Sequence, residues 1–430
     1  MIKNKWNFIK NKEGKDLASN FFFLFFVNIA NFILPLVTFP YLVRVLGIEK
    51  FGLLSFATSI TTYFLILTDY GFNLTATKEI SIHRGDKNKI NEIFSAVMSL
   101  KVIIMIVGFI VLLPFLFLIP KLNVYWYIFV FSYGNVLGQL MYPIWFFQGI
   151  EKMKIISILN ITSKVIFTGA IFLFINSETD FYLVPIFSSL GFVFIGIISM
   201  ILVKFQYKVS FLLQEKAVLY SYLADGWSLF LSNISITLYT TATITFLGIY
   251  TNNTVVGYYS VADKIVAAIR GVVSPLSQVL FPYLCNTAQS DPKKVLYINR
   301  YLALFGGSAM LLVSIFLFVF AEDIIYLIFN KKDSASVIIL QILAVIPFIT
   351  FLHTVFALFT MIVFGKNREY SRIIVSAAFL NLILCLVLIP FFGYKGAAIA
   401  VVIVEFYLLF RYVFFTETTT LRLFRIDSKL

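Results

Sequence analysis

The chain has 430 residues, of which 60% are hydrophobic and 13% are charged. This composition excludes a soluble globular domain and is typical of an all-α protein that crosses a membrane many times. The net charge of +13 is spread over many loops, so membrane topology and anionic lipid headgroups explain it better than a nucleic-acid partner. The chain has only two cysteines, so neither a disulfide framework nor a metal site is expected, and no cofactor is predicted.

Twelve apolar stretches follow one another along the chain, separated by short polar loops. Most contain the roughly 20 residues that a helix needs to cross a hydrocarbon core of about 30 Å. The first, from Leu17 to Val43, is too long for the apolar core of a signal peptide and is therefore counted as a span. The predicted spans are residues 17–43, 51–70, 91–118, 124–147, 155–175, 181–203, 221–249, 255–284, 301–320, 336–363, 373–391 and 396–415.

Basic residues divide the loops between the two sides of the membrane. If residues 1–16 are cytoplasmic, the loops on that side carry 23 Lys and Arg residues, whereas the opposite loops carry six. Lys and Arg are enriched in the cytoplasmic loops of membrane proteins. The asymmetry therefore predicts twelve spans with both chain termini in the cytoplasm.

A polar connection separates the predicted spans into two sets of six. In residues 204–220, Phe205 and Val209 fall on one side of a helix and Lys204 and Lys208 elsewhere, a pattern that predicts an amphipathic helix on the cytoplasmic surface. The expected domains are an N-terminal six-helix lobe (1–203), this cytoplasmic amphipathic linker (204–220) and a C-terminal six-helix lobe (221–430).

The two halves resemble each other at an offset of 205 residues. Eight of 33 aligned positions are identical, and one of them pairs Gly52 with Gly257. Two such repeats around a central cavity are a known plan for transporters, and a single bundle without a cavity is the alternative. Gly134 and Gly138, four residues apart, predict close helix packing within the molecule rather than a dimer contact.

Several charged side chains lie inside the predicted spans. Each one that faces lipid near the bilayer centre costs roughly 2.5–3.5 kcal/mol, so these side chains must reach an interface, form pairs or line water. Five of these side chains lie close enough to the end of a predicted span to reach the membrane–water interface. They are Lys101, Lys164, Arg411, Asp69 and Glu405.

Lys264 and Arg270 lie too deep in the eighth span for this explanation. Asp263 is seven residues from Arg270 and therefore on the same helical face, and Asp225 on the preceding span is a further candidate partner. One interpretation is a buried ion pair that joins spans seven and eight. We favour a solvated cationic cavity, because two cations and a carboxylate gather on one span. Such a cavity suits an anionic cargo with phosphate groups.

Two weaker signals concern Tyr259 and His353. Tyr259 is a candidate for stacking on sugar rings, although aromatic belts at the membrane interface explain most aromatic residues. His353 lies in the middle of a predicted span, where it either titrates in a proton pathway or packs with a hydrogen bond. We favour packing for His353.

Several motifs resemble those of a known family, the bacterial lipid-linked oligosaccharide flippases of the multidrug/oligosaccharidyl-lipid/polysaccharide exporter superfamily. The resemblance covers the whole chain, and Lys78 stands where that family more often has Arg. The motifs are Pro40–Gly47 with Phe51-Gly52, Asp69-Tyr70-Gly71 with Ala76-Thr77-Lys78, Pro143–Met153, Gly257–Lys264 and Pro390–Ala398.

The resemblance implies a flippase of the bacterial cytoplasmic (inner) membrane. Its substrate would be an undecaprenyl-pyrophosphate-linked repeat unit of O-antigen or a similar surface polysaccharide, moved to the outer leaflet by ion-coupled alternating access. The expected partners are the polyprenyl-pyrophosphate-linked glycan, the lipid bilayer, a proton or sodium ion, a polysaccharide polymerase and a chain-length regulator.

On this hypothesis, each candidate residue has a role in binding or in coupling. The candidates for holding the pyrophosphate and sugar are Arg44, Lys264, Arg270 and Tyr259, and the candidates for binding a coupling ion are Asp69, Asp225 and Asp263. No catalytic residue is predicted, and the sequence does not identify the sugar.

Two other functions stay open from the sequence. A drug or cation antiporter of the same superfamily is expected to have a cavity dominated by carboxylates, whereas this one is rich in cations. A membrane glycosyltransferase or polymerase needs a catalytic acid and usually a sizeable outer loop, and neither is visible in the sequence.

Overall fold

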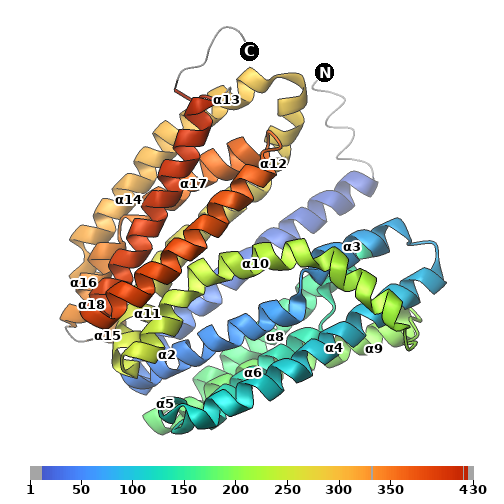
Figure 1. The fold of residues 1–430 in the computed structure, drawn as a ribbon, viewed down its shortest axis with the longest axis horizontal. Coiled ribbons are helices and arrows are strands. Elements are labelled where there is room, and N and C mark those ends of the chain that lie inside the picture. The colour runs from blue at the N-terminus through green and yellow to red at the C-terminus, as the bar shows by residue number, and fades with distance from the viewer. Residues whose placement is uncertain (1–11, 331–332, 420, 425–430) are drawn as a thin grey trace. The chain divides into compact units, whose positions relative to one another are not determined.

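The computed structural model describes the backbone of residues 12–330, 333–419 and 421–424, and within these ranges the side chains from Leu34 onward. The described residues form helices and contain no strand (Figure 1). Nine helical stretches among them are long and apolar enough to cross a membrane. The basic clusters of residues 1–10, and Lys331, Lys332, Arg425 and Lys429, lie outside the described residues.

The chain folds into two compact units, each built from two segments. Unit 1 comprises residues 1–39 and 60–233, and unit 2 comprises residues 40–59 and 234–430. The helices α2 (Lys12–Asp69) and α10 (Lys216–Tyr250) contribute residues to both units. The other helices of unit 1 are α3 (Phe72–Ile82), α4 (Lys87–Leu118), α5 (Pro120–Asn123), α6 (Trp126–Met141), α7 (Ile144–Gly149), α8 (Met153–Phe174), the 3₁₀-helix η1 (Glu178–Tyr182), α9 (Leu183–Ile201) and the π-helical η2 (Leu202–Gln206).

Unit 2 contains the second half of α10 and ten further helices. The π-helical segments η3 and η4 each continue an α-helix. The helices are α11 (Asn253–Gly271), α12 (Val273–Ser290), α13 (Pro292–Tyr301), η3 (Leu302–Gly306), α14 (Gly307–Val319), α15 (Ala321–Phe329), α16 (Ser334–Leu343), α17 (Ile346–His353), η4 (Thr354–Ile362) and α18 (Asn367–Thr418).

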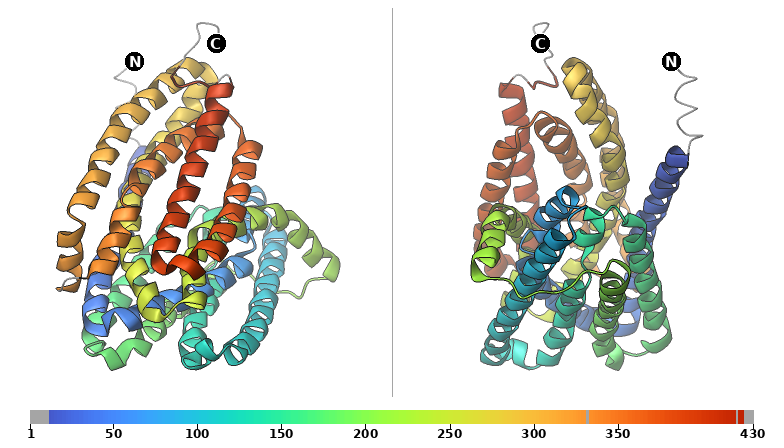
Figure 2. Two further views of the ribbon diagram at one scale, coloured as in Figure 1. Left: turned by 60° about the vertical axis from the view of Figure 1, so that its left-hand side comes forward. Right: turned by 90° about the vertical axis from the view of Figure 1, so that its right-hand side faces the viewer.

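Helix α18 is a hairpin of two antiparallel arms. Its 52 residues exceed what one span needs, and Gly393, with φ +54° and ψ −130°, leaves the helical conformation. The Ser376 hydroxyl lies 2.8 Å from the Tyr407 hydroxyl, and the rings of Tyr370 and Tyr412 are stacked, so the two arms run side by side (Figure 2). Helix α2 is broken in the same way at Gly47, with φ +73°. A total of twelve spans is consistent with these two double-length stretches.

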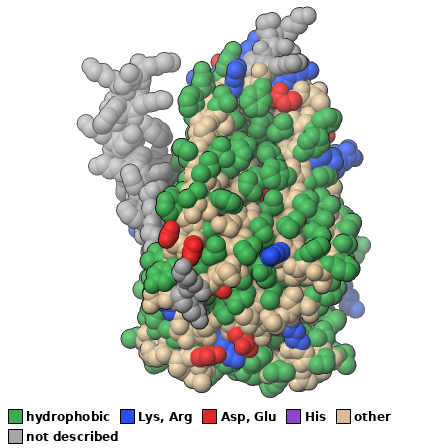
Figure 3. Space-filling model, turned by 90° about the vertical axis from the view of Figure 1, so that its left-hand side faces the viewer, with side chains coloured by type: hydrophobic (Ala, Val, Ile, Leu, Met, Phe, Trp, Pro, Cys, Tyr) green, Lys and Arg blue, Asp and Glu red, His purple; other side chains and the backbone are tan. Residues whose placement is uncertain are grey.

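Hydrophobic side chains cover much of the surface. On the face drawn in Figure 3 they predominate, and charged side chains are few. Large apolar residues such as Leu312 and Phe316 on α14 are exposed. Water would make such a surface unstable, whereas lipid tails solvate it. The prediction of an all-α, multi-pass membrane protein is confirmed.

Small residues let α6 lie close along α9 in unit 1. A Cβ atom on Gly134 would come within 2.7 Å of Ser189, and one on Gly138 within 2.5 Å of Phe192. The two glycines therefore serve helix packing inside the molecule, as their spacing predicted.

The motif around Gly149 fixes a loop to α3 and the turn that follows it. Ile80 lies where a Cβ atom on Gly149 would clash, and the Arg84 Nε donates to the Gly149 carbonyl at 2.7 Å. The Arg84 guanidinium also contacts the Glu151 carboxylate at 2.9 Å. This hydrogen bond and charge lower the pKa of Glu151 below its ordinary value. The Pro143–Met153 motif thus has a structural explanation.

The predicted amphipathic helix over residues 204–220 is wrong. After η2, residues 207–215 contain no helix, and α10 begins at Lys216. The backbone N–H groups of Ser210 and Leu212 donate to Asn91 Oδ1 and Ser95 Oγ on α4, each at 2.9 Å. These side chains accept from backbone N–H groups that would have bonded to carbonyl groups within a helix. The extended segment therefore does not leave these two N–H groups without an acceptor.

Asn91 is the residue that we expect to stabilise this extended path most. Replacing it by alanine leaves the Ser210 N–H without its acceptor at a site where Asn91 is only 7% exposed. The expected loss is about 1–2 kcal/mol of unfolding free energy, measured as a lower thermal midpoint in detergent. Asn91→Asp keeps the acceptor and is the matched control. Equal midpoints for wild type and Asn91→Ala would contradict this role.

Candidate functional site

A chain of four ionisable side chains crosses the interior of unit 2. On α11, Arg270 lies 3.6 Å from Asp263, as their seven-residue spacing predicted. The same guanidinium lies 3.9 Å from Glu405 on the second arm of α18. The other Glu405 oxygen, Oε2, lies 3.2 Å from the Nδ1 of His353, at the end of α17. Three helices therefore meet in one charged cluster, defined here as Asp263, Arg270, Glu405 and His353.

Close backbone packing holds α11 in its place. Asn252 caps the helix by accepting from the Val255 N–H at 2.9 Å. A Cβ atom on Gly52 would lie 1.8 Å from the Asn253 carbonyl oxygen, and one on Gly257 would lie 2.2 Å from the Ile48 carbonyl oxygen. Only glycine permits this approach. The two glycines that match in the internal repeat thus pack the first turns of α11 against residues 48–52.

Glu405 does not reach an interface, so the expectation that it escapes toward a span end is wrong. Its side chain is 2% exposed, since the side chains of α11 and α17 enclose it. His353 is also buried, and its Nε2 lies 3.0 Å from the Glu405 backbone carbonyl. Packing with a hydrogen bond, the favoured interpretation of His353, is confirmed.

Lys264 differs from Arg270 because its side chain is exposed. Its ammonium lies 6.0 Å from the centre of the Phe51 ring, within cation–π range. Arg270 has two carboxylate neighbours, and the ion pair that it makes with another helix joins α11 to α18. Asp225 belongs to the part of α10 that lies in unit 1, and its side chain is exposed.

Arg44 and Tyr259 have structural contacts within unit 2. The Arg44 Nε donates to the Ile328 carbonyl at 2.8 Å, and its guanidinium also donates to the Leu327 carbonyl. Both carbonyls lie in the last turn of α15, where a cation is favourable. Tyr259 is 2% exposed and hydrogen-bonds Thr243, so its ring offers no open face to a ligand in this conformation.

In unit 1, Asp69 forms an ion pair with Lys101. The two groups lie 3.4 Å apart, and Lys101 is 4% exposed. The prediction that Lys101 reaches a solvated interface is therefore wrong, because its ammonium is enclosed in the protein beside a carboxylate on α2. Arg411, in contrast, is exposed and donates to the Tyr407 hydroxyl at 3.0 Å.

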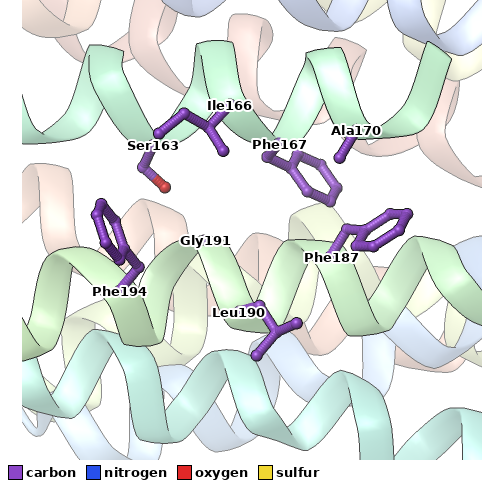
Figure 4. Close-up of a pocket in the computed structure, with 8 residues that line it drawn as sticks. All are labelled: Ser163, Ile166, Phe167, Ala170, Phe187, Leu190, Gly191 and Phe194. Atoms are coloured by element: carbon purple, nitrogen blue, oxygen red, sulfur yellow. The ribbon is translucent and has the colours of Figure 1, made fainter. Parts of the chain in front are cut away.

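An apolar pocket of about 260 Å³ lies between α8 and α9 in unit 1 (Figure 4). Phe167, Phe187 and Phe194 supply aromatic surface, and Ser163 is its one hydroxyl-bearing residue. This lining suits hydrocarbon rather than a charged headgroup. The sequence did not indicate this pocket, because its lining residues do not differ from ordinary membrane-facing ones.

Sequence reasoning also missed that His353 and Glu405 meet. The available signal was depth: Glu405 lies about ten residues from either end of the predicted span 396–415, so the end position expected for it above was misjudged, and His353 lies near the middle of 336–363. Polar groups at equal depth in a membrane tend to pair, since the surrounding hydrocarbon offers no other partner.

Comparisons with known proteins identify relatives over almost the whole chain. A family model described as "Polysaccharide biosynthesis protein" matches residues 17–288. A protein of Escherichia coli (strain K12) named "Putative O-antigen transporter" is 31% identical over 399 residues, which are 92% of this chain and 95% of that protein. A protein of Shigella dysenteriae with the same name is 27% identical, over 90% of this chain and 97% of that protein.

Solved structures share the fold at low sequence identity. The lipid II flippase MurJ, in an inward closed conformation, aligns with a TM-score of 0.65 and 13% identity over 92% of this chain and 87% of that one. An inward-facing multidrug resistance transporter of the MATE family, in the MOP superfamily, aligns with a TM-score of 0.61 and 13% identity over 90% of this chain and 97% of that one. The chain therefore belongs to the polysaccharide biosynthesis protein family, whose members are membrane transporters rather than enzymes.

Proposed function

We propose that this protein is a flippase for lipid-linked oligosaccharides. Its substrate is an undecaprenyl-pyrophosphate-linked repeat unit of O-antigen or a similar surface polysaccharide, which it moves from the cytoplasmic to the outer leaflet of the bacterial inner membrane. Two relatives that align over nearly their whole length carry the name of O-antigen transporter, and this observation carries the proposal.

The substrate has a hydrophilic head that lipid cannot solvate. Each unpaired hydroxyl costs kilocalories in hydrocarbon, so the head needs a polar route while the polyprenyl tail remains in the bilayer. In this proposal the two six-span lobes alternately open a cavity to either side. Lys264, exposed in the middle of an apolar stretch, supports a phosphate contact there, with Arg270 and Arg44 as further cationic contacts and Tyr259 as a sugar contact once the cavity opens.

An ion gradient and the membrane potential together would drive the cycle. Moving an anion outward across 100 mV, negative inside, releases roughly 2.3 kcal/mol per charge. Asp69, Asp225 and Asp263 are the sequence-based candidates for binding a coupling proton or sodium ion. Both termini would lie in the cytoplasm, and a polysaccharide polymerase and a chain-length regulator would take up the product.

Translocation in vesicles tests the proposal. Purified protein is reconstituted with a fluorescent undecaprenyl-pyrophosphate-linked sugar, and the fraction of headgroups that a membrane-impermeant quencher reaches is followed over time. Faster crossing than in protein-free vesicles is expected. Exchange of a cationic drug for protons without headgroup crossing would instead identify a drug antiporter, and a new glycosidic bond would identify a transferase.

Lys264→Gln is expected to lower the translocation rate at least tenfold while leaving the thermal midpoint unchanged. The ammonium would hold the pyrophosphate only during transport, and in the resting protein it has an exposed position with a weak ring contact. Lys395→Gln, at an exposed lysine in a predicted outer loop, is the matched control and should transport normally. Normal transport by Lys264→Gln would remove Lys264 from the pyrophosphate site.

A further inference from the structure

The carboxylate of Glu405 is in an unusual environment for a charge. It is 2% exposed, and among the described residues its Oε2 atom has no hydrogen-bond partner, although the ring of His353 lies 3.2 Å away. A buried carboxylate oxygen without a hydrogen bond is costly. Glu405 Oε2 is therefore an acceptor that lacks a proton donor.

The two nitrogens of His353 have unequal neighbours. Nε2 faces the backbone carbonyl of Glu405 at 3.0 Å, and a carbonyl only accepts, so Nε2 carries a hydrogen. In a neutral imidazole, Nδ1 then has a lone pair, and it lies 3.2 Å from Oε2, which is also electron-rich. A second proton, on either Nδ1 or the carboxyl group, turns this repulsion into attraction.

We propose that His353 and Glu405 together form a proton-binding site inside unit 2. The site takes up one proton between Nδ1 and Oε2, in addition to the hydrogen on Nε2. The local backbone is adapted to it, because α17 changes at His353 into the nine-residue π-helical segment η4. Segments of π-helix inside α-helices occur frequently at functional sites.

Arg270 connects this site to the rest of the charged cluster. Without the proton, Glu405 is an anion that competes with Asp263 for the Arg270 guanidinium. With the proton, the cluster gains one positive charge and Arg270 is released from Glu405. The other ionisable groups that face the pair are Tyr239 on α10 and Tyr370 and Tyr412 on α18.

Proton binding and anion binding therefore reinforce each other, as thermodynamic reciprocity requires. This second step rests on the proposed function, because it assumes that a pyrophosphate approaches Arg270. The proton site itself does not depend on that assumption. A proton that binds together with the outgoing pyrophosphate does not drive its export. The site therefore sets the charge of the cluster during substrate binding, and the candidates for the driving ion stay those named above.

Nitrogen NMR of the full-length protein in lipid nanodiscs tests the site directly. The chain has two histidines, so His83→Gln leaves His353 as the one labelled ring. Between about pH 9 and pH 5 we expect Nε2 to stay protonated while Nδ1 gains a proton. Glu405→Gln should weaken proton binding at least tenfold, since it removes the negative charge, whereas Glu178→Gln, at an exposed carboxylate in unit 1, should not.

Three results would overturn the site: an Nε2 that lacks a hydrogen, a titration that is identical in Glu405→Gln, or displacement of the proton by sodium ions but not by potassium ions. If the Glu405→Gln variant does not insert into the membrane, the test uses the wild-type protein instead. The infrared absorption band of its protonated carboxyl groups is then followed over the same pH range. A band that changes together with the His353 titration supports the site, and an unchanging spectrum contradicts it.

The coupling is tested separately by adding undecaprenyl pyrophosphate to weakly buffered proteoliposomes. Wild type should take up protons, and Glu405→Gln should take up at least tenfold fewer. A normal His353 titration without headgroup translocation would refute the proposed function and leave the proton site standing. Translocation with no titration at His353 would refute the proton site alone.

Discussion

Replacing Lys101 by methionine is expected to destabilise the protein by about 3–5 kcal/mol, because Asp69 would keep its charge and lose its buried partner. Lys101 is 4% exposed, so water reaches its position poorly, and the Asp69 carboxylate, 20% exposed, would be only partly solvated. The loss should be visible as a lower thermal midpoint of the purified protein in detergent and as less protein in the membrane fraction.

A double replacement separates the charge from the packing. Lys101→Met with Asp69→Asn removes both charges and should recover most of the lost stability, since a neutral amide costs far less to bury. Lys87→Met, at an exposed lysine at the start of the same helix, is the matched control. If Lys101→Met has the wild-type midpoint, the ion pair does not stabilise unit 1.

The same double variant tests whether Asp69 couples an ion. Rapid, gradient-dependent translocation by a stable Lys101→Met/Asp69→Asn protein would leave Asp69 with a structural role only. Failure to respond to the gradient, at normal stability, would support Asp69 as a coupling residue.

Run lengths of apolar residues predicted the helical class and most spans, because a bilayer imposes a length on each helix. Contacts along one helix were also predictable: Asp263 and Arg270 pair since seven residues make about two turns. Contacts between helices were not. Arg270 reaches Glu405 only because glycine packing sets the position of α11, and no periodicity contains that information.

The linker shows a second limit of sequence patterns. Its apolar and basic residues alternate as in an amphipathic helix, but Asn91 and Ser95 on another helix satisfy its backbone in an extended path. Lys101 illustrates the same limit, since its distance from the span end permitted an interfacial position, and the carboxylate that pairs with it comes from a different helix. Such partners become visible only in three dimensions.

Arg270→Gln is expected to reduce stability by about 3 kcal/mol and to abolish translocation. Its removal would leave the buried carboxylate of Glu405 without a cation, and Asp263 would keep only Lys264 as a cationic neighbour. The thermal midpoint in detergent and the vesicle assay measure the two effects. The stability loss alone would not show whether Arg270 also binds the substrate. The Arg270→Gln replacement must therefore also be made in a variant that lacks the charge of Glu405.

Glu405→Gln is that variant, because it removes the buried charge that Arg270 neutralises. Adding Arg270→Gln to Glu405→Gln should change the midpoint much less than Arg270→Gln does in the wild-type protein. Any translocation that remains in Glu405→Gln should nevertheless fall at least tenfold in the double variant, since the pyrophosphate loses a cationic contact. Equal translocation rates in the single and double variants would mean that Arg270 serves only to neutralise Glu405, and the pyrophosphate contact would then rest on Lys264.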